Sequence, residues 1–209
     1  MLSFVVLPVP RACAQESQLV AEDQKIDATK FEPLYRAGKN FVGAVDVGIN
    51  YQKFTDLLQA MASELSIATD KVNNEKEKQL LALYAEAFSA YKDCGTLWDY
   101  KIKDAGSYSG YILFDMSNQA VRVKNRTSWR YREVLVPIVQ KYNLFAETKS
   151  SGSGGLLVGG DVDYKVLQGD QAVQAVMSAA GKLLEPANKM YLAAQESKKA
   201  QSSADSTDK

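Results

Sequence analysis

Apolar residues at helical spacing are the strongest feature of this sequence. Between positions 80 and 102 they form one continuous stripe: Leu80, Leu81, Tyr84, Ala87, Phe88, Tyr91, Cys94, Trp98 and Ile102. Similar stripes occupy residues 31–45, 54–72, 131–145 and 172–194. A single amphipathic helix cannot bury such a stripe alone, whereas several antiparallel helices can. The sequence therefore predicts an all-α fold, an antiparallel bundle of four to five helices with a Gly-rich loop before the last helix.

Residues with capping preferences mark where the first helices begin and end. Thr29 and Glu32 have the spacing of a capping box, which predicts that the first helix starts at Thr29. Gly48 is suited to the end of that helix, and Asn50 to the start of the second. The pair Asn73–Asn74 is expected to end the second helix and cap the third.

The second half of the chain is less regular. A fourth helix is predicted from Asn118 towards Phe145, and the last helix is expected to start near Asp170. Residues 107–116 are aromatic and apolar, and their pattern leaves open a strand, a helical turn or a packed connection. Residues 150–168 are predicted to be a loop, because SSGSGGLLVGG holds five glycines. We expect one bundle domain over residues 15–196 and a disordered tail over residues 197–209.

The N-terminal residues have the pattern of an export signal. The apolar run Leu2–Val9 is followed by Ala12-Cys13-Ala14, a small-x-small motif of the kind that signal peptidase cleaves. Residues 1–14 are therefore predicted to be a signal peptide, and the mature protein to be periplasmic or secreted. The alternative is a lipoprotein anchored through Cys13. Cleavage after Ala14 would leave Cys94 as the single cysteine, which we expect to be a buried apolar residue.

The composition excludes several classes of function. Histidine is absent, so Ser-His-Asp and Cys-His catalysis and His-ligated metal sites are excluded. The 25 basic and 25 acidic residues cancel, which gives no electrostatic case for nucleic acid as a partner. No carboxylates converge in a catalytic spacing, and no apolar segment is long enough to span a membrane. We expect no cofactor, no metal and no catalytic residues, although an enzyme is left open.

Two groups of residues are candidates for ligand binding. The aromatic residues Tyr84, Tyr91, Trp98 and Trp129 are predicted to line a pocket between helices. Arg122, Arg126 and Arg130 lie four residues apart, so on one helix they would share a face and anchor an anion. The alternatives are an ordinary aromatic core and a solvated charged face.

A third candidate is a contact surface for a partner. Leu156, Leu157 and Val158 are apolar residues inside the Gly-rich loop, and such a triplet can bind another protein if it is exposed. Our leading hypothesis is an exported, non-catalytic helical bundle that acts through protein or cell-envelope contacts. The alternative is a bundle that binds or senses a small apolar or anionic molecule.

Overall fold

Helices make up most of the residues that the structure describes. The computed structural model describes residues 25–104, 111–115, 120–123, 126–144, 147–150 and 163–204, with side chains for residues 25–102, 133–144 and 169–200. The helices are α2 (Ala28–Val47), α3 (Tyr51–Lys71), α4 (Glu75–Asp104), α5 (Trp129–Lys141) and α6 (Gly169–Ala204).

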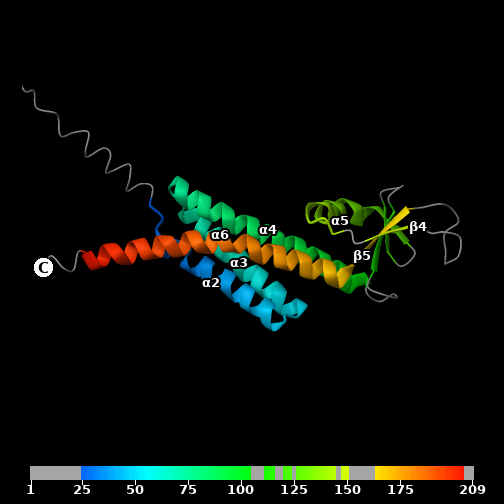
Figure 1. Cartoon of the computed structure of the whole chain (residues 1–209), viewed down its shortest axis with the longest axis horizontal. Helices are drawn as coiled ribbons and strands as arrows, with labels where there is room; N and C mark the ends of the chain where they lie inside the picture. Colours follow the sequence, from blue (N-terminus) through cyan, green and yellow to red (C-terminus); the bar gives the residue numbers. More distant parts are fainter. Residues whose placement is uncertain are drawn as a thin grey trace, which may run out of the picture.

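The predicted antiparallel helical bundle is confirmed. The long helices α4 and α6 lie side by side and share the most extensive contact among the described helices and strands (Figure 1). The shorter helices α2 and α3 form a hairpin that packs against this pair. None of the described helices is long and apolar enough to cross a lipid bilayer.

Most of the predicted helix ends are confirmed by capping hydrogen bonds. Asn50 Oδ1 accepts the Lys53 N–H at 2.8 Å, and Asn74 Oδ1 accepts the Glu77 N–H at 2.9 Å. Gly48 ends α2 with a φ of 97°, a conformation that favours glycine. The predicted start of α2 at Thr29 was wrong. Asp27 is the N-cap, and its carboxylate accepts both the N–H and the hydroxyl of Thr29, which leaves Thr29 inside the helix.

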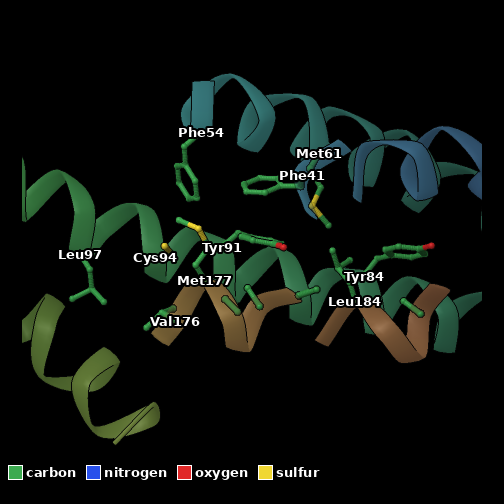
Figure 2. Packing of buried hydrophobic residues seen from close by; sticks show 14 of the residues in the cluster. Phe41, Phe54, Met61, Tyr84, Tyr91, Cys94, Leu97, Val176, Met177 and Leu184 are labelled. Atoms are coloured by element: carbon green, nitrogen blue, oxygen red, sulfur yellow. The ribbon is translucent and has the colours of Figure 1, made fainter. Parts of the chain in front are cut away.

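One apolar core runs through the bundle. On α3 it takes every seventh residue, namely Phe54, Met61 and Ala68. Figure 2 shows Phe41, Phe54 and Met61 reaching from α2 and α3 towards the tyrosines of α4. The helices approach closely where glycine leaves room. A Cβ on Gly95 would lie 3.1 Å from the Phe54 ring, so the helical spacing depends on the absent side chain.

A five-stranded antiparallel sheet lies between α4 and α6 in the sequence, an addition to the helical bundle that the sequence analysis did not predict. Its strands are β1 (Tyr111–Asp115), β2 (Ala120–Val123), β3 (Arg126–Ser128), β4 (Glu147–Ser150) and β5 (Asp163–Gln168). Their order is β3-β2-β1-β5-β4. In Figure 1 the sheet and α5 lie at one end of the α4–α6 pair.

The sheet settles one open assignment and corrects two boundaries. Residues 107–116, left open above, contain β1. The fourth helix begins at Trp129 and not at Asn118, because Ala120–Val123 and Arg126–Ser128 pair as β2 and β3, where alternating and β-branched residues favour a strand. The predicted loop 150–168 is shortened by β5, while residues 151–162, with the glycine run, lie outside the described residues.

The last helix is longer than predicted. The tail was expected to be disordered from Ser197, but α6 continues to Ala204. Lysine, alanine and glutamine favour a helix, and a helix that is already formed adds further residues at little cost.

Candidate functional site

Both tyrosines of the predicted pocket lie in the packed core. Tyr84 and Tyr91 are buried, and the ring of Tyr91 stacks on Phe41 with centroids 3.9 Å apart. The Tyr84 hydroxyl donates to Asn188 Oδ1 at 3.2 Å. Each of these two side chains therefore has a clear packing role, while their predicted role in ligand binding stays a prediction.

A row of aromatic rings leads from this core to the surface. The rings of Phe41 and Phe54 pack in a T-shaped arrangement with centroids 5.2 Å apart, and the centroids of Phe54 and Trp98 are 5.3 Å apart. Trp98 in turn meets Tyr51 at 5.8 Å. The sequence analysis named Tyr91 and Trp98 as pocket residues. It placed Phe41 and Phe54 only in the apolar stripes of the first two helices, and did not predict that they link Tyr91 to Trp98.

Trp98 is the ring of this row that lines an open groove of about 500 Å³. The groove lies where the turn between α2 and α3 meets the end of α4 and the start of α6. Its apolar lining comes from Val45, Ile49, Trp98, Val173 and Met177. Its polar side chains are Asp46, Lys101, Asp170, Gln174 and Ser178.

The charged groups of the groove are unevenly paired. Lys101 forms a salt bridge with Asp170 across the gap between α4 and α6. Asp46 is exposed at the end of α2, and within the part of the chain that the structure describes it has no salt bridge. Because the first two charges neutralise each other, the lining keeps one negative charge.

The arginine prediction changes with the fold. Arg122 lies in β2, Arg126 in β3 and Arg130 in α5, so the three residues do not share one helical face. Arg122 pairs with Thr127 and Arg126 with Val123, and such neighbouring register positions belong to opposite faces of a sheet. The shared-face interpretation was therefore wrong.

The remaining predicted site residues are only partly described. Trp129 is the first residue of α5, and its side chain lies outside the described residues, as do those of the three arginines. Leu156, Leu157 and Val158 also lie outside them. Their proposed part in a partner contact stays a prediction.

A second hollow, of about 310 Å³, lies at the other end of the bundle. It is lined by Ala28, Thr29, Glu32, Tyr191, Gln195, Lys198 and Lys199. Two of its charged side chains form salt bridges within the chain: Glu32 pairs with Arg36, and Lys198 Nζ lies 3.8 Å from Asp27 Oδ1. This hollow is therefore a weaker candidate than the groove at Trp98.

The expectation that Cys94 is a buried apolar residue is confirmed. Its thiol donates to the Val173 carbonyl, with Sγ and O 3.5 Å apart, and burial raises the pKa of Cys94 to about 12. A thiol held protonated is a poor nucleophile. No cluster of three Cys, Asp or Glu side chains able to hold a metal occurs among the described residues.

Alkaline pH tests the burial of the core tyrosines. Desolvation raises the pKa of Tyr91 above its ordinary value of 10.0, so above that pH the unfolded chain loses a proton that the folded chain keeps. The contribution of each such tyrosine to the free energy of unfolding is therefore fully present below pH 10. Above pH 10 the free energy of unfolding falls by about 1.4 kcal/mol per pH unit for each of them. Urea unfolding at pH 9 and pH 11 should show that Tyr91→Phe loses about 1 kcal/mol less than the wild type. Equal losses would contradict the buried phenol.

Comparison with protein families, with curated proteins and with solved structures finds no match for this chain. Its function is therefore inferred from its own sequence and from the described residues.

Proposed function

We propose that the protein is an exported, non-catalytic helical bundle that binds a protein or envelope partner through the groove at Trp98. The observation that carries the proposal is this open groove, which is lined by an aromatic ring and apolar side chains from three segments, with Val45, Ile49 and Trp98 partly exposed. Interfaces are enriched in aromatic residues and methionine, and Trp98 and Met177 are the side chains of that kind in the lining.

Two exposed apolar side chains are next in sequence to residues that line the groove. Val47 follows Asp46 and is 89% exposed, and Ile102 follows Lys101 and is 48% exposed. Exposed apolar side chains close to a hollow support a contact with another protein.

Two further observations support a non-catalytic role. Burial holds the phenols of Tyr84 and Tyr91 and the thiol of Cys94 in their protonated forms, which are unsuited to act as bases or nucleophiles. The charged side chains of the groove include one satisfied ion pair and one exposed carboxylate. Such a set is better suited to binding than to proton transfer.

Export is proposed from the N-terminal pattern. The run Leu2–Val9 and the motif Ala12-Cys13-Ala14 together support cleavage after Ala14. The intact mass of the protein purified from its own cells would identify the cleavage site directly. A chain that begins at Gln15 agrees with the proposal, a lipid on Cys13 indicates an anchored protein, and retention of residues 1–14 contradicts signal cleavage.

A second candidate function is favoured by the size of the groove. Its volume of about 500 Å³ lies within the range of about 300–1,000 Å³ that small-molecule sites occupy. On this alternative, Trp98 would be the residue of the predicted aromatic pocket that contacts the ligand.

Site-specific photocrosslinking separates these two functions. A photoreactive amino acid at Val47, introduced in the cells of origin, should give a specific protein adduct. The control position is Ile67, which is exposed on α3 but lies near the other end of that helix. A protein adduct from position 47 alone supports the partner function. No adduct, together with a small molecule retained in native mass spectrometry, supports the second candidate instead.

A further inference from the structure

We propose that the groove binds a lysine or arginine side chain of the partner, with an apolar residue next to it. This inference depends on the proposed function, because it names the chemistry of the partner segment at the same site. Three features of the groove carry it: a carboxylate without a salt bridge among the described residues, a helix end with no basic residue in its last turn, and an aromatic ring held by its neighbours.

The carboxylate is that of Asp46. Of the three charged side chains in the lining, Lys101 and Asp170 form a salt bridge with each other. Asp46 is left without a salt bridge in the described part of the chain. An anionic partner group would meet this carboxylate, whereas a cationic group would pair with it.

The position of Asp46 in its helix strengthens the argument. A helix C-terminus carries a partial negative charge, which a basic residue in the last turn normally offsets. Helix α2 has no basic residue in its last turn, and Asp46 adds a full negative charge there. The arrangement is unfavourable for the isolated bundle, and a cation supplied by a partner would relieve it.

The aromatic ring is that of Trp98. Its contacts with Phe54 and Tyr51 restrict its movement, and it remains half-buried at the groove. The face of an indole ring attracts ammonium and guanidinium groups. Trp98 and Asp46 therefore offer a cation two different favourable contacts within one groove.

The apolar lining explains why the partner needs more than a charge. Val45 is half-buried at the groove, and Val173 and Met177, which are 6% and 8% exposed, line it with hydrocarbon and a polarisable thioether. Lysine and arginine have aliphatic stems that pack on such surfaces while the charged end stays near water. An apolar neighbour on the partner would cover the remaining lining.

The test uses short peptides of defined charge on the full-length protein. Acetylated and amidated Leu-Lys-Leu, Leu-Arg-Leu, Leu-Gln-Leu and Leu-Glu-Leu are titrated, and the indole N–H signal of Trp98 is followed by NMR. The second tryptophan signal is assigned with Trp129→Phe. The lysine and arginine peptides should bind about three- to tenfold more tightly than the glutamine peptide. The glutamate peptide should bind more weakly still.

Asp46→Asn should abolish the preference for the cationic peptides and leave the melting temperature unchanged or slightly raised. Asp56→Asn is the matched control, because Asp56 is exposed on α3 and is not part of the groove lining. This control should keep the preference.

Three outcomes would overturn the inference. They are no binding by any peptide, equal binding of the lysine and glutamate peptides, and binding of free n-butylammonium as tight as that of the lysine peptide. The last result would assign the groove to free amines and not to a protein segment. A protein adduct at Val47 together with any of these results would retain the proposed function and reject only the cationic partner.

Discussion

Phe41→Ala is expected to lower the free energy of unfolding by about 4 kcal/mol. Phe41 is fully buried, stacks on Tyr91 and meets the edge of Phe54, so its removal leaves a cavity between α2, α3 and α4. Neighbouring rings that are themselves packed cannot collapse into this space. Equilibrium unfolding in guanidinium chloride measures the loss.

Phe88→Ala is the control for Phe41→Ala. Phe88 is also a phenylalanine of the bundle but is only half-buried, so its removal should cost less than half as much. A double-mutant cycle between Phe41 and Tyr91 should give a coupling of about 1 kcal/mol for the stacked pair. Similar losses for Phe41→Ala and Phe88→Ala would contradict the packing described here.

The bundle could be predicted from the sequence because its signals are local. The stripe from Leu80 to Ile102 needs only a period of 3.6 residues to be read as a helix, and Asn50 and Asn74 cap the helices that directly follow them. The burial of Cys94 could be predicted from its position in the same stripe. These features depend on neighbours within a few residues.

The sheet could not be predicted in the same way. Its strands have only three to six residues each, too few for alternation to be distinguished from a helical period. The pairing of β1 with β5 joins residues that lie more than forty positions apart. Arg122, Arg126 and Arg130 fit a helical spacing equally well, and the pairing of β2 with β3 decides between the two patterns.

The candidate site was found only through one residue. Trp98 belongs to a visible stripe, but Asp46, Ile49 and Met177 join it because three distant segments meet at the α2–α3 turn. In the sequence, Asp46 is one polar residue near a helix end. That Asp46 leaves the groove with one negative charge is apparent only when the pairing of Lys101 with Asp170 is known.

The second large effect is expected at Glu77, which is only 1% exposed and holds the start of α2 against the turn between α3 and α4. Its carboxylate accepts the N–H groups of Asp27 and Asn73 at 3.0 and 3.1 Å. It also accepts two hydrogen bonds from Lys30 Nζ, at 2.8 and 3.0 Å. Each of these donors needs an acceptor, since a buried donor without a partner costs about 1–3 kcal/mol.

Glu77→Gln should therefore lower the free energy of unfolding by about 2–4 kcal/mol, as measured by urea denaturation at pH 7. The glutamine amide keeps the shape of the side chain but has only one acceptor oxygen. Its NH₂ group, itself a donor, replaces the second oxygen and faces N–H donors that then have no acceptor. Glu75→Gln is the matched control, because Glu75 is 78% exposed and forms only a surface pair with Lys78. It should cost less than about 0.5 kcal/mol.

Because Lys30 shares the site, Lys30→Met combined with Glu77→Gln should cost less than the sum of the two single changes. Additive losses, or equal losses at Glu75 and Glu77, would show that the buried network does not tie these elements together.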